Sequence, residues 1–350
     1  MKSPPIVHAV DLFCGLGGLS FGLKEAGVRV RAGIDLDPTC KFAFEANVGA
    51  KFICKDIKDV SAEELMQLWP KRGLRLLAGC APCQPFSSFR RGTDTKGDEK
   101  WPLLDEFRRL VEATRPELVT MENVPGLKST EVFARFVRAL EDVGYSVAYK
   151  SCYGPKYGLP QHRRRLVLLA SLLGPIGFPA ETNDASNFVT VKDVIAGLPK
   201  LQAGQADPAD PLHKARSLTP LNLARIRASK PGGTWRDWPS HLRSPCHTRA
   251  TGASFQSVYA RMTWSEPAPT ITTQAYNFGT GRFGHPDQDR AISLREAAML
   301  QGFPRDYAFV RPDAEPEFLS IGRLIGNAVP PPLGRAIGEQ ISVHTKVSKR

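Results

Sequence analysis

Short apolar runs alternate with stretches of helical periodicity through residues 6–170. The apolar runs predict strands at residues 6–13, 28–34, 51–54, 74–80 and 118–122. The intervening stretches predict helices at residues 19–26, 38–47, 62–69, 103–113 and 131–143. Such alternation of strand and helix predicts an α/β fold with a doubly wound, Rossmann-like and mainly parallel sheet.

The pattern weakens after residue 170. Between residues 185 and 284, Pro, Gly, Ser and Thr interrupt every candidate element, which indicates a second, smaller and loop-rich domain. Helical patterns return at residues 294–300 and 334–343. We therefore expect residues 1–185 and 320–350 to form the first domain, residues 186–290 the second, and residues 291–319 a hinge.

Composition fits a folded protein of a reducing compartment. No apolar run reaches the roughly 18 residues of a membrane span, and the N-terminus lacks the apolar core of a signal peptide. A cytoplasmic, nucleoid-associated location is therefore expected. The seven cysteines are irregularly spaced, which argues against a disulfide framework. Cys80 and Cys83 form a single C-x-x-C without further ligands at zinc spacing, so no metal is expected, and a redox pair is the alternative.

Lys and Arg outnumber Asp and Glu by 47 to 35, which gives a formal net charge of +12. An excess of this size suits a polyanionic partner, because basic side chains displace condensed counterions from phosphates. The charge therefore predicts nucleic acid as the partner. A basic but inert surface is the alternative.

A glycine-rich turn follows the first predicted strand. The strand runs into the sequence DLFCGLGG at residues 11–18, and Asp35 ends the second strand. Glycine lets a ligand approach the backbone closely, and an acid at the second strand end can bind ribose hydroxyls. This layout indicates a nucleotide-type site, with a tight structural turn as the alternative. Asp56, after the third strand, could accept from an adenine amino group or cap a helix.

Candidate chemistry gathers at the ends of the fourth and fifth predicted strands. Cys83 follows the fourth strand and Glu122 ends the fifth. If the two strands are neighbours, a thiol and a carboxyl group meet at the carboxyl edge of the sheet, where α/β proteins place their chemistry. Such a pair can add a thiolate to a ring carbon while the acid protonates a ring nitrogen. The alternative is that Cys83 is a small buried hydrophobic residue.

Two arginines follow in the segment 161–166. If the segment is a strand, Arg163 and Arg165 point to the same face. Their guanidinium groups could hold a base oxygen, a phosphate or Glu122. A solvated basic strand edge is the alternative.

Six ordered motifs together resemble those of the DNA cytosine-5 methyltransferases. They are Phe13-x-Gly15-x-Gly17-Gly18, Pro82-Cys83-Gln84, Glu122-Asn123-Val124, Gln161-x-Arg163-x-Arg165, Pro269-Thr270-Ile271-Thr272 and Gly326-Asn327-Ala328-Val329-Pro330. The resemblance runs from Ile6 to about Gly338, except for the middle of the second domain.

The resemblance implies a catalytic role for each matching residue. Cys83 would be the nucleophile, Glu122 the proton donor at cytosine N3, and Asn123 would shape the pocket. Arg163 and Arg165 would hold the flipped-out cytosine and its flanking phosphate, and residues 84–100 would close over double-stranded DNA. The residues implied for S-adenosylmethionine are Phe13, Gly15, Leu16, Gly17, Asp35, Leu36, Asp56, Ile57, Pro82 and Asn327.

The sequence departs from the family pattern at the cofactor end. Asp35 stands where Glu is common, and Leu36 where a large aromatic residue is common, so both cofactor contacts should be somewhat weaker. Cys80 is an additional thiol that we interpret as strand packing.

The second domain would be the target recognition domain. Its candidates for DNA contact are Arg243, Thr248, Arg249, Thr251 and Arg261. The recognised sequence cannot be read from them. A monomer is expected, and a separate cognate restriction endonuclease is compatible with the sequence.

Three other functions compete with this interpretation. One branch of the same family methylates transfer RNA, but the Cys-Phe-Thr tripeptide associated with that branch is missing. An NAD-dependent oxidoreductase would explain the glycines and Asp35 but leave Cys83 without a role. A silent DNA-binding module would explain the charge but require neither Cys83 nor Glu122.

Overall fold

The computed structural model describes residues 5–82, 102–249 and 256–347, and the chain divides into two compact units. The first unit comprises residues 1–157, 164–182 and 329–350, and the second comprises residues 158–163 and 183–328. This division differs from the expected one, because residues 158–163 and 291–328 belong to the second unit. Helix α9 (Leu294–Leu300) packs there against α6 (Val191–Ile195), α10 (Phe318–Asn327) and strand β9 (Asp210–Lys214), so residues 291–319 are not a free hinge.

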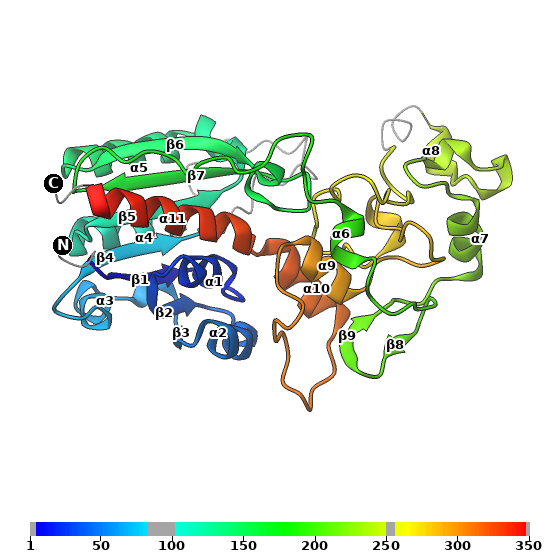
Figure 1. The fold of residues 1–350 in the computed structure, drawn as a ribbon, viewed down its shortest axis with the longest axis horizontal. Coiled ribbons are helices and arrows are strands. Elements are labelled where there is room, and N and C mark those ends of the chain that lie inside the picture. Colours follow the sequence, from blue (N-terminus) through cyan, green and yellow to red (C-terminus); the bar gives the residue numbers. More distant parts are fainter. Residues whose placement is uncertain (1–4, 83–101, 250–255, 348–350) are drawn as a thin grey trace. The chain divides into compact units, whose positions relative to one another are not determined.

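A seven-stranded sheet forms the centre of the first unit, in the order β3-β2-β1-β4-β5-β7-β6 (Figure 1). The strands are β1 (Val7–Leu12), β2 (Arg29–Asp35), β3 (Lys51–Cys54), β4 (Leu74–Gly79), β5 (Leu118–Asn123), β6 (Ser146–Tyr153) and β7 (Arg164–Ser171). The first five are parallel, and β7 runs antiparallel between β5 and β6. The α/β fold with a doubly wound, mainly parallel sheet is thereby confirmed.

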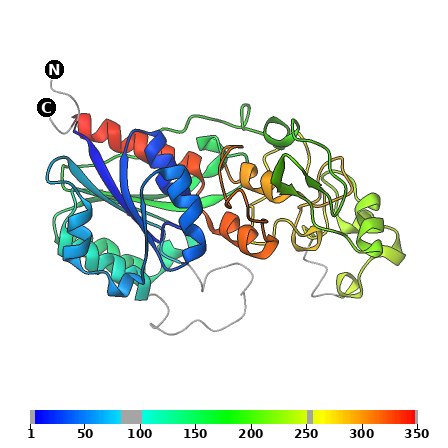
Figure 2. The same ribbon diagram turned by 90° about the horizontal axis from the view of Figure 1, so that it is seen from below.

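Helices cover both faces of this sheet (Figure 2). The helices of the unit are α1 (Gly18–Glu25), α2 (Lys41–Val48), α3 (Ala62–Leu68), α4 (Pro102–Thr114), α5 (Glu131–Asp142) and α11 (Pro331–Val347). Successive strand residues point to opposite faces, so Val10 and Leu77 join the core under α4 and α5, while Ala9 and Leu76 join the core under α1 and α11. Strands buried on both faces explain the uninterrupted apolar runs of the sequence.

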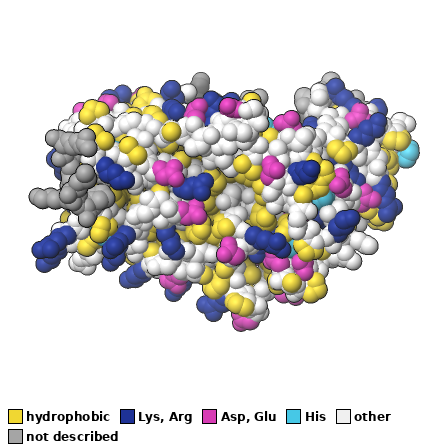
Figure 3. Space-filling model, in the orientation of Figure 1, with side chains coloured by type: hydrophobic (Ala, Val, Ile, Leu, Met, Phe, Trp, Pro, Cys, Tyr) yellow, Lys and Arg dark blue, Asp and Glu magenta, His cyan; other side chains and the backbone are white. Residues whose placement is uncertain are grey.

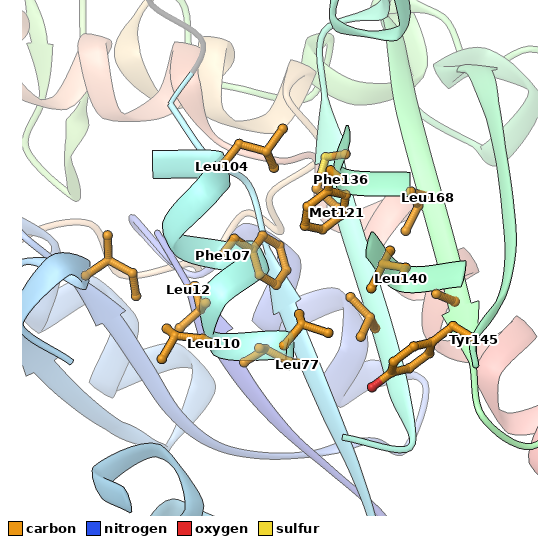
Figure 4. Packing of buried hydrophobic residues seen from close by; sticks show 14 of the residues in the cluster. Leu12, Leu77, Leu104, Phe107, Leu110, Met121, Phe136, Leu140, Tyr145 and Leu168 are labelled. Carbon is orange, nitrogen blue, oxygen red and sulfur yellow. The ribbon is translucent and has the colours of Figure 1, made fainter. Parts of the chain in front are cut away.

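The core on the α4 and α5 side is rich in aromatic and leucine side chains (Figure 4). Phe107 of α4 and Phe136 of α5 meet with ring centroids 5.5 Å apart in a tilted arrangement. Met121 of β5 and Leu168 of β7 belong to the same cluster, and both are fully buried. This packing fixes the positions of β5 and β7, whose ends carry predicted site residues.

Helices α1 and α11 approach one another at glycines. A Cβ added to Gly22 would lie 2.2 Å from the Pro331 carbonyl oxygen, and one added to Gly334 would lie 2.8 Å from the Leu19 carbonyl oxygen. Only glycine therefore permits the observed spacing. The prolines at the start of α11 stand in its first turn, where their missing N–H groups cost nothing.

The second unit is loop-rich. Besides α6, β9, α9 and α10, its elements are β8 (Ala206–Asp207), α7 (Pro220–Ala228), α8 (Pro245–Thr248) and short 3₁₀ turns. Strands β8 and β9 form a two-stranded sheet. A small core gathers Ile226, Trp235, Trp238, Leu242 and Phe278.

Most predicted elements lie within a few residues of the observed ones, but β6, α10 and the short elements α6, β8, β9, α7 and α8 of the second unit were not predicted. Strand β6 is the last strand in the sheet order, and Ser146, Lys150 and Ser151 break its apolar pattern. Within the described ranges, no helix is both long enough and apolar enough to cross a membrane.

Candidate active site

The glycine-rich turn after β1 has an unusual backbone. Phe13, Gly15 and Gly17 all have positive φ, at 58°, 51° and 91°. A phenylalanine in this region is strained, and such strain concentrates at functional sites. A Cβ added to Gly15 would meet no atom within 4 Å, so the space above this residue is open. The turn can therefore admit a ligand against its backbone.

Asp35 joins the end of β2 to this turn. Its Oδ2 accepts from the Gly15 N–H at 2.8 Å, and its Oδ1 accepts from the Asp37 N–H at 2.9 Å. Each carboxylate oxygen has a second lone pair, so both can still accept a hydroxyl donor. The geometry suits the predicted role at a ribose.

Asp11 is a buried carboxyl group below the same turn. It is 1% exposed, and Ser20 of α1 donates its hydroxyl to Asp11 Oδ2 at 2.7 Å. The other oxygen, Oδ1, has no hydrogen-bond partner in the described part of the chain. Burial, with a smaller contribution from the Asp35 charge, raises the pKa of Asp11 to about 7. Asp11 was not among the residues predicted for the site, although an acid inside an apolar strand is a signal that the sequence offers.

The remaining predicted cofactor residues of the first unit differ in exposure. Leu36 is 65% exposed, and Pro82 is exposed beyond the end of β4. Leu16 and Ile57 are buried. Asp56 accepts from the Lys58 N–H at 3.0 Å and caps a 3₁₀ turn, as the alternative for this residue anticipated.

Strands β4 and β5 are parallel neighbours, with Gly79 opposite Met121. The strands that precede Cys83 and carry Glu122 are therefore neighbours, as the predicted pairing of thiol and acid requires. Cys83 lies outside the described residues, as does the segment 84–100. Glu122 is 2% exposed at the carboxyl end of β5.

Glu122 is held from both neighbouring strands. Arg165 of β7 places Nε 3.0 Å from Glu122 Oε1, and Cys80, just after β4, donates its thiol to Glu122 Oε2 at 3.1 Å. The arginine contact is an ion pair without hydrogen-bond geometry, and Oε1 has no hydrogen-bond partner among the described residues. The hydrogen-bonding capacity of one oxygen of this buried carboxyl group is thus not filled by the described residues.

Asn123 braces the segment that leads to Cys83. Its Nδ2 donates to the Ala81 carbonyl oxygen at 2.9 Å, and its Oδ1 accepts from the Val124 N–H at 2.8 Å. The side chain is 2% exposed. Its two hydrogen bonds thereby connect the segment after β4 with the segment after β5.

Arg163 does not share a strand face with Arg165, because β7 begins at Arg164. Arg163 belongs to the second unit and is 3% exposed. It donates to the carbonyl oxygens of Ile271 at 3.0 Å and Gly326 at 3.1 Å. The expectation that both guanidinium groups point together is therefore wrong, since each has its own set of partners.

Three of the motifs meet inside the second unit. Gln161 Oε1 accepts from the Ile271 N–H at 3.0 Å. A Cβ added to Gly326 would lie 2.4 Å from the Thr272 backbone, so the end of α10 packs tightly on this segment. Asn327, the last residue of α10, is exposed beside it.

The predicted DNA contacts of the second unit fall into two groups. Arg243 and Arg249 are exposed, Thr248 ends α8, and Thr251 lies outside the described residues. Arg261 is 5% exposed and donates to the carbonyl oxygens of Ile226, Ser229, His285 and Gln288 and to the Asp289 carboxylate. The prediction that Arg261 contacts DNA is therefore not supported, because its guanidinium group is buried and bonded to other parts of the second unit.

Comparison with known proteins places these motifs in one family. The model of the C-5 cytosine-specific DNA methylases matches residues 7–343. The type II methylase M.HgiDII of Herpetosiphon aurantiacus is 48% identical over 95% of this chain and 94% of its own length. The type II methyltransferase M1.HphI of Haemophilus parahaemolyticus is 30% identical over 95% and 86%.

Solved structures share the fold. A putative DNA modification methyltransferase encoded within an Escherichia coli prophage superposes with a TM-score of 0.73 at 22% identity, over 96% of this chain and 98% of that chain. The Dnmt2 methyltransferase of Schizosaccharomyces pombe gives a TM-score of 0.58 at 16% identity, over 97% and 98%.

Proposed function

Because the chain belongs to the C-5 cytosine-specific DNA methylase family, we propose that it transfers a methyl group from S-adenosylmethionine to C5 of a flipped-out cytosine in a specific double-stranded DNA sequence. The observation that carries the proposal is the buried Glu122 carboxyl group at the end of β5, next to the strand that leads to Cys83. A cytosine in the stack offers neither C5 nor C6 to a side chain, so the base must leave the helix.

Cys83 is proposed to add as a thiolate to C6, which makes C5 a nucleophilic enamine carbon. Glu122 gives a proton or a hydrogen bond to N3 and so lowers the cost of this addition. Its Oε1, which lacks a hydrogen-bond partner among the residues described, is the oxygen that suits this contact. After methyl transfer, loss of the C5 proton and release of Cys83 restore the ring.

The residues at the carboxyl ends of β1 and β2 fit S-adenosylmethionine, which supplies the methyl group when bound. Asp35 retains acceptor positions for ribose hydroxyls, and the open space above Gly15 allows close approach to the backbone. Asp56 keeps one carboxylate oxygen for the adenine amino group. Asn327, which the family resemblance also implies for the cofactor, belongs to the second unit.

The two arginines are proposed to act differently. Arg165 orients Glu122 through their ion pair. Arg163 is proposed to stabilise the segment around Ile271 rather than to touch DNA, because its guanidinium group is buried against two carbonyl oxygens.

Sequence recognition is proposed for the second unit, with Arg243 and Arg249 as exposed candidates. The role of a type II methylase, with a separate endonuclease for the same site, follows the names of the similar proteins.

Methyl transfer can be tested with labelled S-adenosylmethionine and either duplex DNA or transfer RNA. We expect label in duplex DNA, and bisulfite sequencing of DNA from an expressing host should reveal the recognised sequence. Label in transfer RNA alone would overturn the proposed substrate.

The nucleophile can be tested with Cys83→Ser. We expect this variant to lose methyl transfer but to bind the cofactor, while the wild type forms a stable adduct on DNA that carries 5-fluorocytosine. Full activity of Cys83→Ser would refute the mechanism.

A further inference from the structure

Cys80 is the only side chain that donates a hydrogen bond to Glu122 within the described ranges. Its sulfur lies 3.1 Å from Glu122 Oε2, while Arg165 faces Oε1 at 3.0 Å. Simple strand packing, the interpretation from the sequence, does not require a thiol to face a carboxylate. Cys80 also packs against the apolar core on one face of the sheet, so its thiol takes part in both kinds of contact.

We propose that Cys80 is a positioning residue, whose thiol fixes the orientation of the Glu122 carboxyl group for its contact with the target base. The proposal rests on the proposed function. Cys80 follows β4 and Arg165 belongs to β7, so the carboxyl group is held from the strands on both sides of β5. Without the thiol, Oε2 would lose its only hydrogen bond among the described residues, and the carboxyl plane could rotate.

The thiol is suited to remain a donor throughout the reaction. Burial, followed by the nearby Glu122 charge, raises the pKa of Cys80 well above its usual value. A protonated thiol is a weak donor, so it can orient a carboxylate without binding it as firmly as an N–H group would. Glu122 can therefore exchange its proton with the base while Cys80 retains its own.

Steady-state kinetics of two substitutions distinguish positioning from packing. Cys80→Ala removes the donor, whereas Cys80→Ser keeps a hydroxyl donor in the same place. We expect kcat to fall about tenfold in Cys80→Ala, a modest loss for a misplaced group, with KM for DNA and S-adenosylmethionine within about twofold. Cys80→Ser should recover most of kcat. A packing role predicts the opposite order, because a hydroxyl group is less suited than a methyl group to an apolar site.

Cys152→Ala is the matched control. Cys152 of β6 is buried in the core on the same face of the sheet, and in the described structure it makes no hydrogen bond to Glu122. Its loss should lower thermal stability without lowering kcat by more than about twofold, a bound that stays well below the effect of misplacing a reacting group. Equal loss of kcat in Cys80→Ala and Cys80→Ser, or no loss in Cys80→Ala, would overturn the proposal.

The Raman S–H stretching band provides a readout that does not depend on activity. The band of Cys80, isolated by subtracting the Cys80→Ala spectrum, should lie below that of a free thiol. It should move to higher frequency in Glu122→Gln, because a neutral amide is a weaker acceptor than a carboxylate. An unshifted band would reject the contact itself, whereas an inactive wild type with a shifted band would reject the proposed function and leave the contact in place.

Discussion

Replacing Asp11 with asparagine should change how the free energy of unfolding depends on pH. In the folded protein, burial and the Asp35 charge raise the pKa of Asp11 to about 7. In the unfolded chain an aspartate titrates near 3.9, so the folded state binds one proton more between these two values. This contribution to stability is fully present below about pH 4 and is lost as the pH rises through 7. Asparagine carries no such proton.

The magnitude follows from the difference between the two pKa values. About three pKa units correspond to roughly 4 kcal/mol at about 1.4 kcal/mol per unit. Roughly 3 kcal/mol of this contribution to the free energy of unfolding is lost between pH 5 and pH 8. The thiols of Cys14 and Cys80 lie nearby, but burial raises the pKa of both well above its usual value, so they do not titrate in this window.

Urea unfolding of wild type and Asp11→Asn at pH 5, 6, 7 and 8 measures the effect. The wild type should lose stability relative to the variant as pH rises, by roughly 3 kcal/mol in total. Asp184→Asn is the control: hydrogen bonds from Ser186 lower the pKa of this exposed carboxyl group, so its contribution is lost only in more acidic solution. Parallel curves for wild type and Asp11→Asn would refute the reasoning about burial.

Three further substitutions test the site and the fold. Glu122→Gln should lower kcat by about 10² to 10⁴-fold with little change in the Kd for S-adenosylmethionine; the reverse pattern would refute its role as an acid. Asp35→Ala should raise KM for S-adenosylmethionine by about 10 to 100-fold, with kcat restored at saturation; an unchanged KM would place the ribose contact elsewhere. Arg261→Ala should lower the free energy of unfolding by about 3 to 5 kcal/mol, because several buried carbonyl groups lose their donor. The exposed Arg249→Ala should change it by less than about 1 kcal/mol, and similar losses for both would contradict the difference in burial.

Strands whose two faces are both buried could be predicted from the sequence. Strands such as β1 and β5 are buried on both faces and therefore read as unbroken apolar runs. The position of Glu122 at the carboxyl end of β5 followed from the α/β pattern, whereas its closeness to the end of β4 was only conditional in the sequence and is shown by the pairing of the two strands. The glycine-rich turn after β1 was recognisable in the sequence from its glycines, of which Gly15 and Gly17 take positive φ.

Features decided by contacts distant in sequence could not be predicted. Helix α10 contains Gly322 and Gly326, which look like helix breakers, yet a Cβ at either position would collide with Tyr276 or the Thr272 backbone. The thiol of Cys80 and the Glu122 carboxylate lie 42 residues apart in sequence. Nothing local indicated that this cysteine faces a carboxylate.

The count of 47 Lys and Arg residues overstates the number of basic side chains that DNA can reach. On the face shown in Figure 3, Lys and Arg side chains lie scattered among Asp and Glu. Among the described residues, the buried arginines all belong to the second unit: Arg163, Arg225, Arg261, Arg290 and Arg295.

These buried arginines compensate for the scarcity of helices and strands in the second unit. A loop-rich unit leaves many carbonyl groups without backbone partners, and a guanidinium group offers five donors to them. Arg290 also forms a bidentate pair with Glu296, with both distances at 2.7 Å, and Arg295 pairs with Asp210 at 2.6 Å. Charges neutralised in this way cannot release counterions from DNA. The salt dependence of binding should therefore follow exposed residues such as Arg243, whereas substitution of a buried arginine should act through folding.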